Sequence, residues 1–338
     1  MRIPEFGAAC FAAAVAVTPV SSALAAASGA DVPKLPASSW KPEKPVELVV
    51  QSAAGGGSDI FARTMAKALA DEKIVTVPIN VVNKPGGSGA VAYSYLSRKK
   101  GDPYVIATAT GSYITTPVQK QSPVSYKDFT NVAVLCVEDY VGVVRADSPY
   151  KSLKDLIAAA KQKPNGIRVG GSGPAGSDAI IRNRVEKAAK VKLNYIVFQS
   201  GGEVNAALLG GSVDFASPNP SEATQLVKAG RLRPLAMFSS ERLDNWKDVP
   251  TAREQGVDVT LEQFRGMVAA GGLTKDQSLF WQNAMVKMFQ SPGFKKYLQE
   301  NGLRPLVKVG GDADKYLAEQ TAFYTEILTE LGVVKKKK

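Results

Sequence analysis

The amino-acid sequence predicts an α/β protein of two lobes that are joined by a double-crossover hinge. Three observations support this prediction. The 338 residues exceed the usual size of one domain, and strand-like and helix-like runs alternate over most of the chain. Two similar Gly-rich segments, 54–60 and 174–180, lie in separate parts of the chain, and each follows a strand-like run.

The N-terminal 25 residues are predicted to be a signal peptide. Arg2 supplies a positive charge ahead of the apolar stretch 8–17, which is too short to span a bilayer. Ala23-Leu24-Ala25 fits the small-x-small cleavage pattern, so we place cleavage after Ala25; a buried N-terminal helix is the alternative. Export to the periplasm or cell surface follows. Residues 26–43, rich in Ala, Ser, Pro and Lys, predict a flexible tether.

Charge and cysteine usage narrow the classes of partner. The net charge is +11 with no histidine, which favours anionic ligands or an acidic partner. No nucleic-acid recognition motif is present, so no nucleic-acid partner is expected. Cys136 alone remains in the mature chain, so no internal disulfide is expected, and its apolar surroundings indicate an inert core thiol.

The elements follow from short apolar runs and from one-sided helical patterns. The strand-like runs are 46–51, 77–82, 104–108, 132–137, 140–145, 167–170, 193–198, 213–216, 232–238 and 265–269. Helices are expected after Asp59 and Asp178, and the C-terminal third is mostly helical. Its three helices are 276–290, 292–301 and 312–331. This alternation predicts parallel sheets that helices cover on both faces.

The order of the elements predicts how the chain divides. Lobe 1 is expected to hold residues 44–141 and 267–334, and lobe 2 residues 142–266. The chain then crosses twice between the lobes, and a double crossover is the connection that a hinge needs. Ligands of open α/β sheets bind beyond the carboxyl ends of the strands, where both Gly-rich segments fall.

Each Gly-rich segment opens a helix, and this predicts an anion site. A helix N-terminus offers unpaired backbone N–H groups and the positive end of the helix dipole. Two such sites, one per lobe, predict that the lobes close on one small anion. The alternative is that each segment is only a tight strand-to-helix connection, capped by Ser58 or Asp59 in the first segment and by Asp178 in the second. Residues 171–176 also match a dinucleotide fingerprint, but no acidic residue ends the next strand, as that motif requires.

Catalytic chemistry has little support in the sequence. Without histidine a Ser-His-Asp triad is excluded, and no nucleophile elbow, Walker loop or Cys/His metal cluster is present. No cofactor or metal is therefore expected. The enzyme alternative is a secreted protein that acts on a small anion through Asp59 and Asp178. Their expected role is to cap helices, with one of them receiving a ligand hydroxyl or ammonium.

Further residues are placed near the cleft by their position after strands. Ser112 and Tyr113 follow the third strand of lobe 1, and Gly201 follows the second strand of lobe 2. The hydroxyl groups of Ser58, Ser172 and Ser177 are candidate donors. The aromatic candidates for packing on the ligand, or alternatively for plain core packing, are Tyr113, Phe198 and Phe264.

At these residues the chain resembles the Bug-type receptors, which are the solute-binding components of tripartite tricarboxylate transporters. The family's strand followed by Gly-Gly-x-x-Asp is matched by residues 49–59, with Arg63 following. Its Asn-x-Pro-Gly-x-x-Gly turn is matched by residues 83–89. Its later signatures are matched by 201–202, 209–214, 229–233 and 249–251.

The resemblance implies a type II periplasmic-binding fold, closed on a small carboxylate for delivery to membrane permease subunits. The ligand would be a di- or tricarboxylate, an aromatic acid or an acidic amino acid. A monomer without a cofactor is expected, and a sensing module for a signalling partner is an alternative role. By position, the resemblance assigns ligand binding to Ala54, Gly56, Ser58 and Asp59 in lobe 1 and to Ser172, Gly173 and Ser177 in lobe 2.

Overall fold

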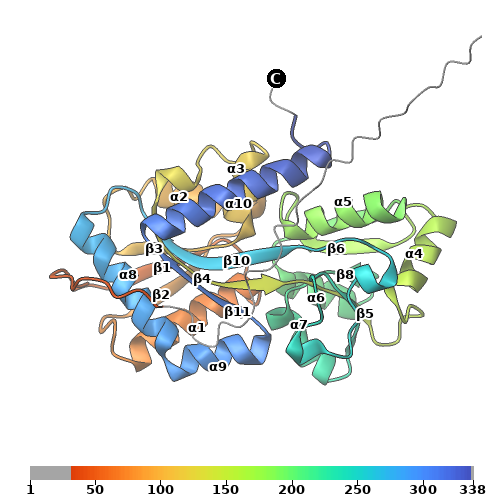
Figure 1. Cartoon of the computed structure of the whole chain (residues 1–338), viewed down its shortest axis with the longest axis horizontal. Coiled ribbons are helices and arrows are strands. Elements are labelled where there is room, and N and C mark those ends of the chain that lie inside the picture. The colour runs from red at the N-terminus through yellow and green to blue at the C-terminus, as the bar shows by residue number, and fades with distance from the viewer. Residues whose placement is uncertain (1–31, 336–338) are drawn as a thin grey trace, which may run out of the picture.

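The computed structural model describes residues 32–335 and shows two α/β lobes that lie side by side (Figure 1). Each lobe contains one β-sheet with helices packed on it, so the predicted two-lobed fold is confirmed. The predicted signal peptide, with cleavage after Ala25, lies outside the described residues.

Lobe 1 is built on a six-stranded sheet. In spatial order its strands are β11 (Arg304–Val309), β4 (Thr130–Asp139), β10 (Glu262–Ala269), β3 (Val105–Ala109), β1 (Val46–Val50) and β2 (Ile79–Asn83). One face carries α1 (Gly57–Asp71), α8 (Lys275–Gln290) and α9 (Pro292–Asn301). The other face carries α2 (Ala90–Ser97), α3 (Gly111–Val118) and α10 (Gly311–Glu330).

Lobe 2 is built on a five-stranded sheet. In spatial order its strands are β7 (Asn194–Phe198), β6 (Arg168–Ser172), β8 (Phe215–Ala216), β5 (Val141–Arg145) and β9 (Leu232–Met237). Its helices are α4 (Leu153–Gln162), α5 (Ser177–Ala189), α6 (Gly201–Leu209) and α7 (Pro220–Lys228). One apolar cluster runs through both lobes, and each lobe adds a second cluster of its own.

The sheets are mixed, which corrects the expectation of parallel sheets. β1 pairs in parallel with β2 and β3, but β10 runs antiparallel to both β3 and β4. β10 pairs along its whole length in the lobe 1 sheet, so the chain returns to lobe 1 ahead of Glu262 rather than at residue 267. The antiparallel direction follows because the chain re-enters lobe 1 at the hinge, beside the end of β4.

The hinge consists of two crossing segments that are hydrogen-bonded to each other. β4 passes into β5 through Tyr140, whose carbonyl accepts from the Phe238 amide at 2.8 Å. The Phe238 carbonyl in turn accepts from the Leu261 amide at 2.9 Å, immediately before β10. Asp139 is paired with Glu262 where the two strands leave lobe 1. The double crossover that the sequence predicts is therefore a short paired ribbon.

The segment before β1 differs from the predicted tether. From residue 32 onward it packs on lobe 1, and the Trp40 ring contacts the rings of Tyr104 and Phe280 edge-on. The Asp276 carboxylate at the start of α8 accepts from the Trp40 amide at 2.8 Å and from the Ser39 hydroxyl at 2.7 Å. Composition predicted flexibility because Ala, Ser and Pro dominate, but the Trp40 ring and the hydrogen bonds to Asp276 hold the segment on lobe 1.

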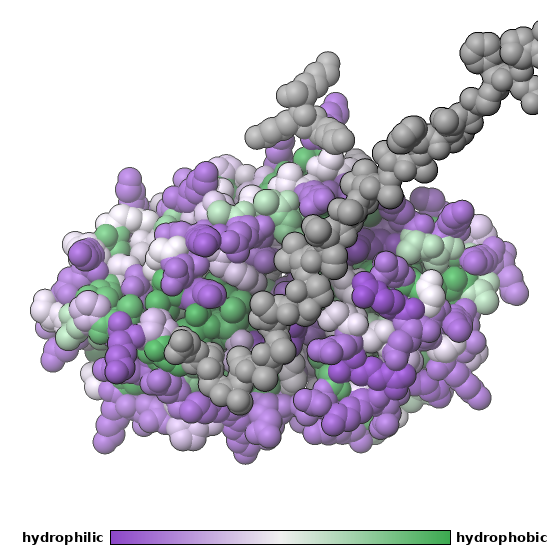
Figure 2. All heavy atoms as spheres, viewed as in Figure 1, coloured by the Kyte–Doolittle hydropathy of each residue, from purple (hydrophilic) through white to green (hydrophobic). Residues whose placement is uncertain are grey.

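Hydrophilic residues cover most of the visible face of both lobes, as Figure 2 shows. Among residues 32–335, no helix is both long enough and apolar enough to cross a membrane. Cys136 is buried, in keeping with its predicted place in the core.

Helix α4 has a reciprocal cap that offers a direct test of local stability. The Ser152 hydroxyl accepts from the Asp155 amide at 3.1 Å, and the Asp155 carboxylate accepts from the Ser152 amide at 2.9 Å. Ser152→Ala should lower the free energy of unfolding by about 1 kcal/mol, measured by urea denaturation. Ser152→Thr keeps an acceptor and should retain most of the stability. An unchanged midpoint for Ser152→Ala would contradict a capping role.

Candidate functional site

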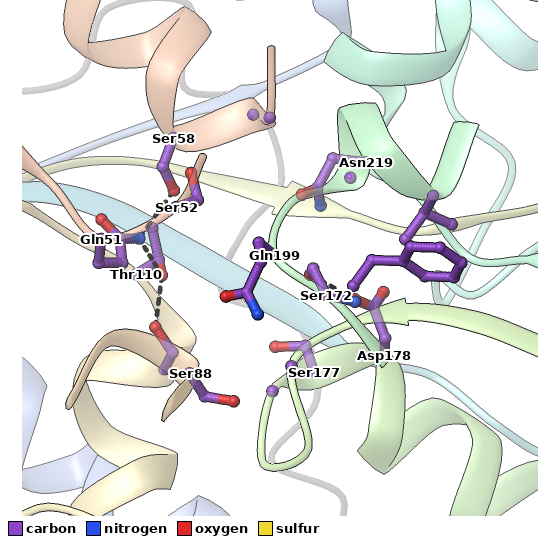
Figure 3. A pocket seen from close by; sticks show the side chains of 18 of the residues that line it. Gln51, Ser52, Ser58, Ser88, Thr110, Ser172, Ser177, Asp178, Gln199 and Asn219 are labelled. Carbon is purple, nitrogen blue, oxygen red and sulfur yellow. Dashed lines mark hydrogen bonds between the residues drawn. The ribbon is translucent and has the colours of Figure 1, made fainter. Parts of the chain in front are cut away.

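A cavity of about 110 Å³ lies between the lobes, at the carboxyl ends of the strands (Figure 3). Lobe 1 contributes Gln51 after β1 and Thr110 after β3, and lobe 2 contributes Ser172 and Gln199 at the ends of β6 and β7. The N-termini of α1, α3, α5 and α6 all reach this cavity. Their backbone amides and positive dipole ends therefore converge on one small volume.

The first Gly-rich turn is held in shape by Asp59. Its carboxylate accepts from the Gly55 amide, the Arg63 guanidinium and the Asn83 side chain, each at 3.0 Å. Burial acts to raise the pKa of Asp59, but these donors outweigh it and hold the pKa below its usual value. Gly55 needs its left-handed φ of 81° to make the turn. Asp59 thus positions the turn and does not line the cavity.

The second Gly-rich turn is held in the same way by Asp178. Its Oδ2 accepts from the Ser172 amide at 2.7 Å and from the Ser172 hydroxyl at 2.6 Å. Burial raises the pKa of Asp178 despite these donors. Asp178 does line the cavity, whereas Asp59 does not. The two carboxylates therefore do not face each other across the cavity, as the enzyme alternative needs, and each accepts from a backbone amide of its own loop.

Hydrogen bonds join the lobes next to the cavity, and four of them involve Ala53 or Ala175. The Ser88 hydroxyl accepts from the Ala175 amide at 3.1 Å. The Ala175 carbonyl accepts from Thr115 and from Gln119, each at 2.9 Å. The backbone of lobe 1 also meets lobe 2 directly, since the Ala53 amide donates to the carbonyl of residue 199 at 3.3 Å. The lobes are in contact: the second Gly-rich turn meets Ser88 and α3 of lobe 1, and the first meets the start of α6 in lobe 2.

Gln51 organises the lobe 1 wall of the cavity (Figure 3). Its amide nitrogen donates to the Ser58 hydroxyl at 2.8 Å and to the Thr110 hydroxyl at 3.1 Å. Its carbonyl oxygen accepts from the Thr108 hydroxyl at 2.6 Å. Because the Ser58 hydroxyl accepts from Gln51, its own hydrogen can point toward the cavity, whereas the Thr110 hydroxyl also bonds to the Ser112 hydroxyl at 3.3 Å. The sequence offered no motif for Gln51 beyond its position at the end of β1.

Glu222 is a cavity residue that the sequence reading missed. It lies on α7 of lobe 2, and its Oε1 accepts from the Gly57 amide of α1 at 2.5 Å. Its Oε2 accepts from the Asn219 amide at 3.0 Å. Burial raises the pKa of Glu222 to about 7. Residues 219–222 carry a visible capping signal, Asn-Pro-x-Glu, but nothing in that pattern points to a second lobe.

The predicted site residues divide into two groups. Those that line the cavity are Gly56, Ser58, Ser112, Ser172, Gly173, Ser177 and Gly201, together with the aromatic candidate Phe198. Those that do not line it are Ala54, Asp59, Tyr113 and Phe264. Tyr113 is 1% exposed, and its hydroxyl donates to Asn131 at 2.9 Å. Phe264 is fully buried, so both rings are core aromatics, the alternative that the sequence left open.

No metal centre is visible in the described chain. Within residues 32–335 there is no group of three His, Cys, Asp or Glu side chains that would hold a metal ion. The polar part of the cavity wall consists of amides, hydroxyl groups and two carboxylic acids, and Val197, Phe198 and Val204 add apolar surface.

The two α/β lobes and the paired hinge ribbon define the type II periplasmic-binding fold, and a cavity between the lobes is rimmed by helix N-termini. The chain belongs to the tripartite tricarboxylate transporter family of receptors, whose family model matches residues 61–333. The resemblance that the Gly-rich motifs indicated is thereby confirmed.

Individual proteins agree with this assignment. A UPF0065 protein in the gbd 5′ region of Cupriavidus necator is 27% identical over 319 residues, which is 94% of this chain and 96% of that protein. Among solved structures, the periplasmic binding protein BugD superposes with a TM-score of 0.81 at 23% identity, covering 87% of this chain and 100% of BugD. MatC from Rhodopseudomonas palustris with bound malate gives 0.77 at 22% identity, covering 85% and 99%.

Proposed function

We propose that this protein is a periplasmic receptor that captures a small organic carboxylate and hands it to the membrane subunits of a tripartite tricarboxylate-type transporter. It carries out no reaction. The observation that carries the proposal is the convergence of four helix N-termini from two lobes on one small cavity. Such an arrangement stabilises an anion without a charged side chain.

The backbone supplies the donors for that anion. Within the described chain, no hydrogen-bond acceptor is found for the amides of Ser58, Ser177 and Gly201, at the starts of α1, α5 and α6. Each hydrogen bond from such an amide to a carboxylate contributes about 1.5–3 kcal/mol. Because the donors come from both lobes, the ligand and lobe closure stabilise each other.

The relatives support a carboxylate as the ligand class. The chain belongs to a receptor family for tricarboxylate transporters, and the structurally similar MatC holds malate. The enzyme alternative has less support, because Asp59 is engaged by three donors outside the cavity and cannot act with Asp178 on one substrate. A sensing role would use the same closed lobes. Binding of the closed form to the membrane subunits of a transporter would favour transport over sensing.

A ligand panel tests the proposal. The purified mature protein would be heated with di- and tricarboxylates, aromatic acids and acidic amino acids, and its melting temperature recorded by differential scanning fluorimetry. At least one acid should raise the melting temperature, because a ligand at 100 times its Kd stabilises the folded state by about 2.7 kcal/mol. The matching neutral amide is the control and should produce no shift. A panel without any stabilising acid would refute a carboxylate receptor.

A further inference from the structure

A second hollow lies outside the ligand cavity and shares no lining residue with it. It has a volume of about 660 Å³ and lies between residues 160–164 and 183–192 of lobe 2 and residues 330–331 of lobe 1; we call it the basic groove. Figure 1 shows how the end of α10, which belongs to lobe 1, reaches α5 of lobe 2. The Lys187 amine donates to the Glu330 carbonyl at 3.2 Å across this junction, so both lobes form the walls.

Lysine dominates the charged residues that line the basic groove. The lining contains Lys161, Lys187, Lys190 and Lys192, and all four are exposed. Among residues 32–335, no acidic side chain forms an ion pair with any of them. Like charges that share one hollow repel each other, and an anionic group from outside the chain relieves this repulsion.

The two acidic residues of the lining do not balance the lysines. Glu186 accepts from the Arg182 guanidinium at 3.0 Å, and its other oxygen accepts from a backbone amide at 2.7 Å. Glu330 interacts with Arg184: burial lowers the pKa of Arg184, and the charges of Asp258 and Glu330 oppose that shift. Both glutamates therefore have arginine neighbours already, and a positive surplus remains in the groove.

Between the lysines the basic groove has an apolar floor. Ala160 and Val191 are buried, and Leu331 is half-buried. A lipid bilayer presents a broad surface and cannot fill a hollow of this size, and an inorganic anion would leave the floor uncovered. A peptide segment that carries both carboxylates and apolar side chains matches the lysines and the floor together.

The sequence of this chain supplies no such segment of its own. Residues 335–338, which begin four positions after Leu331, are all lysine and add to the positive charge. Residues 26–31 contain a single acidic residue, Asp31. A second copy of the chain is a poor occupant as well, because each copy carries a net charge of +11. The occupant with matching charge is therefore a segment of another protein.

We propose that an acidic segment of a partner protein, with apolar side chains between its carboxylates, docks in the basic groove. Its carboxylates pair with the four lysines, and its apolar side chains cover the floor. Because the walls belong to both lobes, the docked segment contacts both and depends on their relative position. On the function proposed above, this partner is a membrane subunit of the transporter, since that subunit has to distinguish a closed receptor from an open one.

Carbodiimide cross-linking, which joins a carboxylate to a neighbouring lysine amine, locates the docking site. The probe is a peptide of Glu-Leu repeats; Glu-Ser repeats keep its charge without apolar side chains, and Lys-Leu repeats reverse the charge. Mass spectrometry should find the Glu-Leu peptide on lysines of the basic groove. Fluorescence anisotropy should show weaker binding of the Glu-Ser peptide, no binding of the Lys-Leu peptide, and loss of affinity as salt is added.

Several outcomes would overturn the inference. Cross-links spread over lysines elsewhere, or equal binding of the three peptides, would mean that the groove does not select an acidic segment. Sedimentation with phosphatidylglycerol vesicles, if it depends on the same lysines and the peptides do not bind, would assign the groove to a lipid surface instead. The assay contains no small carboxylate, so it can fail while the ligand panel succeeds, and the two proposals are tested separately.

A charge-reversed variant assigns the binding to this groove. Lys161→Glu combined with Lys190→Glu should lower the affinity for the Glu-Leu peptide at least about fivefold, because two attractive charge pairs become repulsive. Lys275→Glu combined with Lys287→Glu makes the same change of charge at exposed positions of α8 in lobe 1 and should bind the peptide nearly as the wild type does. If the groove variant does not melt cooperatively, Lys161→Gln combined with Lys190→Gln provides the same comparison. Equal affinities of the two folded variants would refute docking in the basic groove.

Discussion

Arg265→Met is expected to destabilise the folded protein by about 3–5 kcal/mol, the loss measured when one partner of a buried ion pair is removed. Arg265 and Glu138 are both fully buried, on the neighbouring strands β10 and β4 at the hinge. The Arg265 guanidinium also donates to the Asn219 side chain at 3.2 Å. Without Arg265, Glu138 would keep its bond from the Ser221 hydroxyl and lose its counter-ion.

A double variant separates lost charge from lost packing. Arg265→Met combined with Glu138→Gln removes both charges, so it should recover part of the stability that the single change loses. Guanidinium denaturation of the three proteins gives the comparison. If the single variant loses less than about 1 kcal/mol, or the double variant is no more stable than the single one, the ion pair is not a main support of the hinge.

Much of the fold was accessible from local sequence patterns. The predicted helix 292–301 has the observed bounds of α9, since Pro292 opens it and Gly302, with a φ of 65°, ends it. β11 was missed, because it contains Pro305 and lies at the sheet edge, where Pro is tolerated but weakens the strand pattern. The antiparallel direction of β10 was inaccessible, because direction depends on the hinge path and not on local periodicity.

The site was predictable where backbone chemistry determines it. Both Gly-rich turns and their serines line the cavity, namely Ser58, Ser172 and Ser177. The reason is that a helix that follows a strand begins beyond the carboxyl end of that strand, where ligands of α/β sheets bind. Side-chain direction was harder to predict. Tyr113 is only one residue past Ser112, yet it turns into the core. Glu222 was missed because its partner, Gly57, is 165 positions away in the other lobe.

Gly202→Val is expected to reduce ligand affinity by at least about a hundredfold, because it keeps the lobes apart. A Cβ at position 202 would lie 3.0 Å from the Gly55 carbonyl carbon and oxygen, which belong to the backbone of the facing turn and cannot rotate away. The two branches of valine extend the overlap, so α6 and the Gly55 turn must separate. The ligand then loses the amides of one lobe, and two or more charge-assisted hydrogen bonds account for the loss.

Gly293→Val is the matched control, since Gly293 is also the second residue of a helix, α9, and a Cβ there meets no atom within 4 Å. Calorimetric titration with the acid that stabilises the wild type should show near-normal affinity for Gly293→Val and little binding for Gly202→Val. Small-angle X-ray scattering should show a larger radius of gyration for Gly202→Val in saturating ligand. Full affinity with a closed particle would mean that the lobes bind without the contact between α6 and the first Gly-rich turn, and the two-sided amide site would be wrong.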